Sequence, residues 1–288
     1  MVEEKKIDYR RIAAQPDTIS EIIKIDEDSP HCFGELDRLL RSDQGAASLV
    51  LRVANSVIYN RGHPIKTLPV AIALLGINVI RSLSILALTR SFFSQSKNKL
   101  IRQHVWNHSL LTAIASQNIC MKMGNSANAE EAFVAGLLHD VGKILLFSHY
   151  SEAYLNALNY WLGKQCSSAE AEQKFLGMDH YHVGQQAVKE WKLPLHFVDY
   201  MGVNLDEFYR TDSEDSAHLG SVQLSLAAAN SLIKGAGIGA SPWGPEKRKA
   251  KLVELGLSRE FCDCLLEDSF MQGLMKNELY QQCADVNS

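Results

Sequence analysis

Apolar residues recur at α-helical spacing almost throughout this chain, while the alternating runs rich in Val, Thr and Tyr that mark strands are missing. This pattern predicts an all-α protein. The chain has 288 residues, 46% of them hydrophobic, so it can bury a sizeable core. A chain of this length usually forms one or two domains, and we expect two packed helical subdomains.

Polar and glycine-rich stretches divide the predicted helices into three parts. The polar stretch 94–99 is the candidate boundary between an N-terminal helical subdomain, 1–95, and a second helical subdomain, 96–235. The Gly-rich segment 235–245 closes with Pro-Trp-Gly-Pro and leads into a C-terminal helical extension, 236–288. We expect two helices in this extension.

Charge and composition argue against several classes of protein. The formal net charge is −4, and no run of Lys or Arg forms a basic stripe, which argues against a nucleic-acid partner. The charged N-terminus lacks the apolar core of a secretion signal, and no segment reaches the roughly 18 uninterrupted apolar residues of a spanning helix. The six cysteines contain no CxxC pair, which favours free thiols in a reducing compartment. We therefore expect a cytoplasmic protein without a membrane partner.

An aspartate lies in the middle of the most apolar predicted helix, 129–150. An uncompensated buried charge costs several kcal/mol, so Asp140 needs a partner. Three partners are open: Lys143 one turn further on, a histidine proton, or a metal ion held by His139 and Asp140 together. Gly136 and two alanines in the preceding turn would let a neighbouring helix come close.

Histidines on two other predicted helices are candidates for the same site. His108 lies on the apolar face of the preceding helix, 101–123. A lone histidine on an apolar face is more often a core residue with its hydrogen bonds satisfied. Together with His139 and the adjacent aspartate, however, His108 supports a polar functional site as well as it supports a purely structural role. His180 and His182 open another helix, whose free amides suit an anion, although a surface turn is the simpler interpretation.

The sequence offers no other recognisable catalytic motif. It contains no phosphate-binding GxxxxGK loop, no GxSxG elbow and no HExxH helix. Five histidines have no partner pattern, and we expect them to be structural or exposed: His63, His104, His149, His196 and His218.

A series of short motifs, in order, resembles the HD-related output domain family, a branch of the HD metal-dependent phosphohydrolase superfamily. The similarity spans about residues 16–235. The motifs are LRVANS at 51–56, AIALLG at 71–76, WNHS at 106–109, EAFVAGLLHD at 131–140, Glu172 followed by Gly177, His180 and Gly184, and WKLP at 191–194. The resemblance implies an HD-like helical bundle with an N-terminal helical subdomain.

The resemblance also implies a set of site residues. In catalytic relatives a His, the His-Asp pair and a late Asp hold metal; His108, His139 and Asp140 match the first three positions. His180 resembles a further ligand, and Lys143 resembles the lysine that meets substrate phosphate in those relatives. One divalent metal, iron, manganese or zinc, is thus implied at the three histidines and the aspartate.

Two departures from the catalytic pattern indicate a degenerate site. No histidine doublet follows WKLP, where the chain reads YMGVN at 200–204, and the late helix reads QLSLAAAN at 223–230 in place of an Asp. Losing these ligands should remove a second metal and weaken the first, because hydrolysis depends on a metal-activated water.

We therefore expect a signal-transduction regulatory or output module in a bacterial cytoplasm, non-catalytic and acting through protein or small-ligand binding. Its partners would be signalling proteins, with a nucleotide ligand and a homo-oligomer left open. The alternative is a metal-dependent phosphohydrolase acting on a nucleotide or cyclic nucleotide, with Lys143 steadying the phosphate charge. In a third interpretation the protein is a structural adaptor, and His139 and Asp140 only hydrogen-bond in its core.

Overall fold

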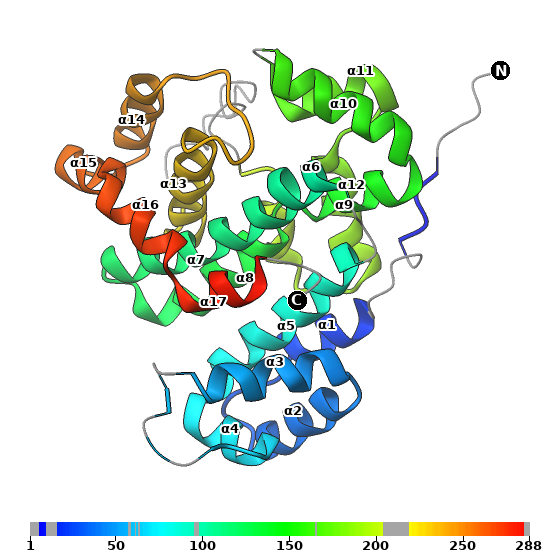
Figure 1. Ribbon diagram of the computed structural model, residues 1–288, viewed down its shortest axis with the longest axis vertical. Coiled ribbons are helices and arrows are strands. Elements are labelled where there is room, and N and C mark those ends of the chain that lie inside the picture. The colour runs from blue at the N-terminus through cyan, green and yellow to red at the C-terminus, as the bar shows by residue number, and fades with distance from the viewer. Residues whose placement is uncertain are drawn as a thin grey trace.

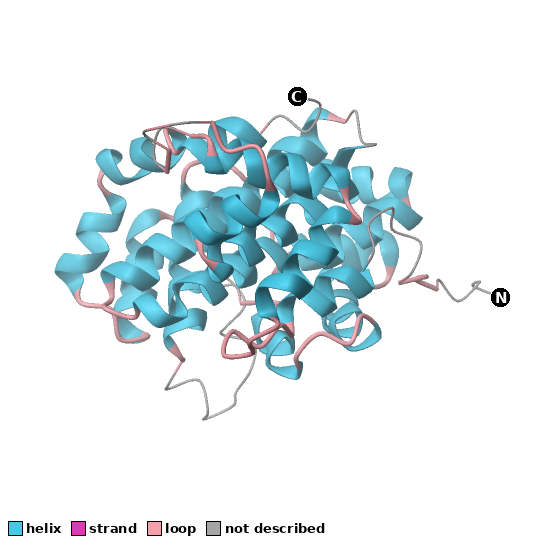
Figure 2. Cartoon of the chain, turned by 90° about the horizontal axis from the view of Figure 1, so that it is seen from below, coloured by secondary structure: helices cyan, strands magenta, loops and turns pink. Residues whose placement is uncertain are grey.

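The computed structural model describes residues 6–9, 16–56, 59–60, 62, 64–94, 98–164, 166–203 and 219–284. Within these ranges the chain consists of helices and loops, with no strand (Figure 2). The all-α class predicted from the helical spacing of apolar residues is therefore confirmed.

The N-terminal group of helices lies at the bottom of Figure 1 and comprises α1 (Pro16–Ile23), α2 (Cys32–Arg41), α3 (Gln44–Ala54), α4 (Leu68–Leu75) and α5 (Ile77–Ser94). Local chemistry sets their ends. The Asp43 carboxylate caps α3 by accepting a hydrogen bond from the Ala46 amide at 2.7 Å. Gly76, with a φ of 79°, ends α4 in a conformation that suits glycine. The long helix α5 packs on α3 and also on α8, which joins this group to the next.

The second group contains α6 (Lys99–Ile101), a π-helical turn (Arg102–Trp106), α7 (Asn107–Lys122), a 3-10 turn (Ser126–Asn128), α8 (Ala129–Leu138), α9 (Val141–His149), α10 (Ser151–Gly163), α11 (Ser168–Leu176), α12 (His180–Glu190), a second 3-10 turn (Leu195–Tyr200) and α13 (Ser221–Gly235). Helices α7, α8 and α13 pack against one another at the centre of the protein. Helix α9 packs on α12, and α10 on α11.

Two predicted helices in this group differ from the structure. The helix predicted at 129–150 is interrupted between α8 and α9, where Asp140 leaves the helical conformation with φ −106° and ψ 17°. Aspartate favours such turns because its short polar side chain competes with helical hydrogen bonding. The helix predicted at 101–123 contains the π-helical turn, a feature frequent near functional sites.

The C-terminal extension forms four helices instead of the two predicted: α14 (Pro245–Glu254), α15 (Arg259–Leu266), α16 (Asp268–Met275) and α17 (Glu278–Cys283). Side-chain caps start the short ones. Ser258 accepts a hydrogen bond from the Phe261 amide, and Asn277 accepts from the amide of Leu279. The extension, orange to red in Figure 1, packs α16 and α17 on α7.

Buried apolar side chains form one continuous cluster that runs from Ile19 in α1 to Cys283 in α17. The predicted parts 1–95, 96–235 and 236–288 thus share a core, and their division stays a prediction. Position 95 lies outside the described residues.

Among the described residues, one segment, Ser126–His149, is long and apolar enough to cross a membrane, and α4 with α5 passes the same test as a pair bent by 119°. In Ser126–His149, 83% of the apolar window is buried inside the protein. Such burial is typical of a core helix, and α8, which forms the first part of this segment, packs against both α7 and α13.

Candidate metal centre

The four predicted metal ligands lie together among α7, α8, α9 and α12 of the second group. His108 comes from α7, His139 and Asp140 from the turn between α8 and α9, and His180 from the start of α12. Their side chains are 1–3% exposed. The Nε2 atoms of His108 and His139 lie 3.5 and 3.4 Å from Asp140 Oδ2, and Nε2 of His180 lies 3.4 Å from Oδ1. The first two histidines and the aspartate form a group compact enough to hold a metal ion.

Two glycines allow the helices to approach this closely. A Cβ at Gly136 would lie 2.6 Å from the Ala113 Cα in α7, and a Cβ at Gly142 would lie 1.9 Å from the His180 carbonyl oxygen in α12. Any larger residue would force α7 or α12 away from the turn that carries Asp140. The sequence predicted the close approach at Gly136, whereas the role of Gly142 emerged only from the structure.

The ring orientations of His108 and His139 are set through their Nδ1 atoms. Nδ1 of His108 donates to the Ile238 carbonyl at 2.9 Å, and Nδ1 of His139 donates to the Gly136 carbonyl at 2.8 Å. A carbonyl can only accept, so each Nδ1 carries the proton and each Nε2 presents a lone pair toward the aspartate. This is the tautomer that a metal-ligating histidine needs.

Glu172 is a site residue that the predicted ligand set missed, although it stands in the motif before His180. Its buried carboxylate accepts hydrogen bonds from the His180 ring at 2.6 Å and from the His180 amide at 2.8 Å. Burial lowers the pKa of His180, but the Glu172 carboxylate outweighs it and holds that pKa above its ordinary value. Glu172 therefore fixes both the position and the charge of the third histidine.

Electrostatics keep the other two histidines neutral and the aspartate ionised. Burial lowers the pKa of His139 to about 4 and that of His108 well below its ordinary value. Burial opposes ionisation of Asp140, but the charge of Lys143 and the charge and hydrogen bond of His180 hold its pKa well below the usual range. Neutral imidazoles and a carboxylate are the protonation states in which these groups bind metal.

The chemistry of the donor atoms fits a divalent metal. Among the described residues, the Nε2 atoms of His108 and His139 are buried without a hydrogen-bond partner, whereas Nε2 of His180 faces Asp140 Oδ1 at 3.4 Å. An unsatisfied buried polar atom costs about 1–3 kcal/mol, and a metal ion would provide the missing partner. Imidazole nitrogen with carboxylate oxygen suits zinc, iron and manganese alike, so the donor set does not select one of them.

Lysines complete the surroundings of the site. Nζ of Lys143 donates to Asp140 Oδ2 at 2.7 Å and lies 5.0 Å from the centre of the Trp161 ring. Of the three partners open for Asp140, this ammonium lies within hydrogen-bond distance of Oδ2, and the His180 ring faces the other carboxylate oxygen at 3.4 Å. Helix α13 has no acidic residue and carries the buried Lys234. The charge of Lys234 adds to the effect of burial in lowering the pKa values of His108 and His139. The phosphate-binding role of Lys143 stays a prediction.

Residues of the extension hold the α7 side of the site. The connector after α13 supplies the Ile238 carbonyl to His108, and the next residue, Gly239, donates its amide to His104 Nδ1 at 3.1 Å. Trp106 Nε1 donates to the Cys283 carbonyl in α17 at 2.9 Å. The sequence contained no local signal for these contacts, because they join positions more than 100 residues apart.

Four further histidines in the described part of the chain have partners outside the site. His182 is exposed and hydrogen-bonds to Asp179, the N-cap of α12, so it does not join His180 in the site. Three of the histidines expected to be structural or exposed make these contacts: His104 with Gly239, His149 with Asp8, and His196 with Glu131. His63 and His218 lie outside the described residues.

Comparison with known proteins identifies the family. The family model for the HDOD domain matches residues 12–204, more than half of the chain, while no curated protein matches it. An HDOD domain protein of unknown function from Geobacter sulfurreducens is 21% identical, with 94% of each chain covered and a TM-score of 0.73. A candidate phosphohydrolase from Shewanella amazonensis SB2B is 18% identical, with 97% of this chain and 96% of that chain covered and a TM-score of 0.65. A candidate signal-transduction protein from Marinobacter aquaeolei VT8 is 19% identical, with 96% of this chain and 60% of that chain covered and a TM-score of 0.70. At these identities the three likenesses show the fold alone, and it is the match over residues 12–204 that establishes that the chain belongs to the HDOD family.

Proposed function

We propose that this protein is a signal-transduction output module that acts by binding and does not hydrolyse phosphate esters. The main observation in support of this proposal is that the side chains of the His-Asp site are buried. Its four ligand side chains are 1–3% exposed, and the connector carbonyl of Ile238 lies against His108. Because these side chains are buried among the described residues, a nucleotide would reach a metal bound at Asp140 only if the surrounding helices moved apart.

The charges around the site support the same proposal. Catalysis of hydrolysis needs a metal with an open position for water or substrate. Instead, the buried carboxylate of Asp140 accepts a hydrogen bond from the Lys143 ammonium and that of Glu172 accepts one from the His180 ring, so both acidic groups have a partner without an added ion. The ammonium of Lys143 is bound to Asp140, where it is not free to meet a phosphate.

In this proposal the partners are signalling proteins in a bacterial cytoplasm. A small ligand such as a nucleotide, or a second copy of the chain, would act at the surface of the module and not at the closed site. The description of the Marinobacter relative as a candidate signal-transduction protein agrees with such a role.

A second function, a metal-dependent phosphohydrolase acting on a nucleotide or cyclic nucleotide, is favoured by one observation. The unpaired Nε2 atoms of His108 and His139 lie beside the Asp140 carboxylate, and iron, manganese or zinc would satisfy them. A metal held there would activate water for attack on phosphorus. The description of the Shewanella relative as a candidate phosphohydrolase agrees with this alternative.

Metal analysis and a phosphodiesterase assay separate the two functions. The full chain and its Asp140→Asn variant would be loaded with manganese, zinc or ferrous iron, analysed for bound metal, and incubated with bis(4-nitrophenyl) phosphate. We expect no turnover above that of buffer with the same metal, whether or not the chain retains an ion. Metal-dependent turnover that the variant lacks would overturn the proposal and establish the phosphohydrolase.

A further inference from the structure

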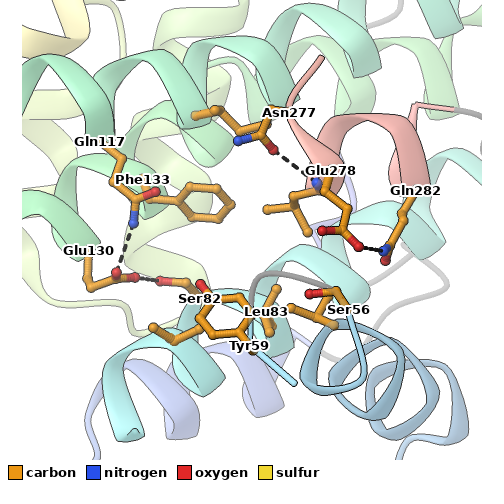
Figure 3. Close-up of a pocket in the computed structure, with 14 residues that line it drawn as sticks. Ser56, Tyr59, Ser82, Leu83, Gln117, Glu130, Phe133, Asn277, Glu278 and Gln282 are labelled. Atoms are coloured by element: carbon orange, nitrogen blue, oxygen red, sulfur yellow. Dashed lines mark hydrogen bonds between the residues drawn. The ribbon is translucent and has the colours of Figure 1, made fainter. Parts of the chain in front are cut away.

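A cavity separate from the His-Asp site lies where the three predicted parts of the chain meet (Figure 3). Its walls include Ser82 of α5, Gln117 of α7, Glu130 of α8, and Glu278 and Gln282 of α17. Its volume is about 120 Å³. A cavity of roughly 150 Å³ admits a molecule the size of benzene, so this one suits a ligand of about six heavy atoms or fewer.

Hydrogen-bond acceptors face the cavity from two sides. On one side the Glu130 carboxylate accepts from Ser82 Oγ at 2.5 Å and from Gln117 Nε2 at 2.8 Å. On the other side Glu278 accepts from Gln282 Nε2 at 3.2 Å, and Gln282 Oε1 is buried with no hydrogen-bond partner among the described residues. A buried acceptor without a donor is unfavourable, so the group that would complete this wall is a hydrogen-bond donor.

The lining is also negatively charged. It contains two carboxylates, Glu130 and Glu278, and no Lys, Arg or His among the described residues that form it. Burial raises the pKa of Glu130, and the side chains bonded to that carboxylate are neutral. Arg81, whose charge reaches Glu130, is itself paired with Glu27 at 2.7 Å. Such a field attracts a cation and repels the phosphate of a nucleotide.

Apolar and aromatic side chains supply most of the remaining cavity wall, beside Ser56 and Asn277. Figure 3 shows the Phe133 ring pointing into the space between Glu130 and Glu278, with Tyr59 and Leu83 on the floor. Hydrocarbon walls of this kind bury a short aliphatic body, and an aromatic ring beside a cation adds attraction through its π face. The ligand therefore needs both a cationic donor end and a small apolar end.

We propose that this cavity binds a small primary ammonium ion with a short hydrocarbon body. The ammonium would donate to the Glu278 carboxylate and to the unpaired Oε1 of Gln282 on one side of the cavity, and the Glu130 carboxylate on the other side adds to the negative field. Because the walls come from α5, α8 and α17, the bound ion would hold the extension against both groups of helices. This ligand site goes beyond the proposed function and is independent of the metal centre.

Thermal unfolding of the full chain with propylammonium chloride as the probe tests the proposal. Because the ion binds the folded state, we expect a saturable rise in Tm, of about 5–10 °C at roughly a hundred times Kd. Sodium chloride at equal ionic strength and 1-propanol, which has the same hydrocarbon body without the charge, should give no comparable rise. Hexylammonium should bind more weakly than propylammonium, because its body exceeds the cavity.

Two variants locate the effect. Glu278→Gln keeps a hydrogen-bonding side chain at a half-buried position and removes one charge, so it should weaken propylammonium binding at least about tenfold in calorimetric titration. Glu152→Gln, at an exposed position of α10 outside the cavity, removes the same charge and should bind like the parent. The proposal is overturned by a rise no larger than that with sodium chloride, by an equal rise with 1-propanol, or by unchanged binding in Glu278→Gln.

Discussion

The substitution Gly142→Ala measures how tightly the His-Asp site is assembled. The added Cβ would lie 1.9 Å from the His180 carbonyl oxygen and 2.9 Å from the Gly184 amide nitrogen. A carbon and an oxygen in contact are about 3.3 Å apart, so α9 and α12 would have to separate by about 1.4 Å. Both atoms belong to the backbone, so no side-chain rotation relieves the overlap.

The cost of Gly142→Ala follows from this geometry. Overpacking costs about 1–3 kcal/mol where side chains can adjust, and a backbone overlap lies at the top of that range, about 3 kcal/mol or more. At about 2–4 °C per kcal/mol for a protein of this size, we expect Tm to fall by about 6–12 °C. The separation also moves His180 away from Asp140 Oδ1, now 3.4 Å distant, so any bound metal should be held more weakly.

Differential scanning calorimetry provides the measurement, and α2 provides the control. An alanine Cβ at Gly34, an exposed position in that helix, would meet no atom within 4 Å. Gly34→Ala should therefore be neutral or stabilising by about 0.5–1 kcal/mol, because alanine is the better helix former. If Gly142→Ala unfolds at the temperature of the parent or of Gly34→Ala, the close approach of α9 and α12 is not a constraint and the reasoning is refuted.

Three further substitutions test separate contacts. Lys143→Met leaves the Asp140 carboxylate buried without its ammonium partner and should lower the free energy of unfolding in urea by about 3–5 kcal/mol; an unchanged value would contradict the pairing. Gly239→Ala forces a side chain into a backbone with φ +90°, with its Cβ 3.2 Å from His108 Nδ1. It should cost about 1–2 kcal/mol by calorimetry, and parental stability would show that the connector tolerates a side chain there. Asp43→Ala removes the N-cap of α3 and should lower Tm by about 2–4 °C, corresponding to about 1 kcal/mol; no change would mean that the cap hydrogen bond is not stabilising.

Short-range patterns determined much of the architecture. The helical spacing of apolar residues predicted the all-α class, because a buried stripe with a period near 3.6 is a property of each segment by itself. Asp43 before α3 and Gly76 after α4 end these helices through chemistry that is likewise local to each segment. The tail was predicted less well, since helices as short as α17 have little intrinsic stability and form mainly through packing and caps.

The residues of the candidate site were predictable from the sequence, but the partners and burial of their side chains were not. The order of motifs singled out His108, His139, Asp140 and His180, and the cost of burying Asp140 required a partner for it. Choosing among the partners needed coordinates, because the distance from Asp140 to Lys143 depends on the turn that interrupts the predicted helix.

Only the tertiary structure decided the contacts between distant parts of the chain. The need for glycine at position 142, the Ile238 carbonyl that orients His108, and the cavity beside Glu130 all join segments that are separate in sequence. Periodicity and motif spacing describe one segment at a time, whereas such contacts depend on how helices pack around a shared core. The sequence by itself therefore determined the helices and the residues that carry chemistry, and packing decided that their site is closed.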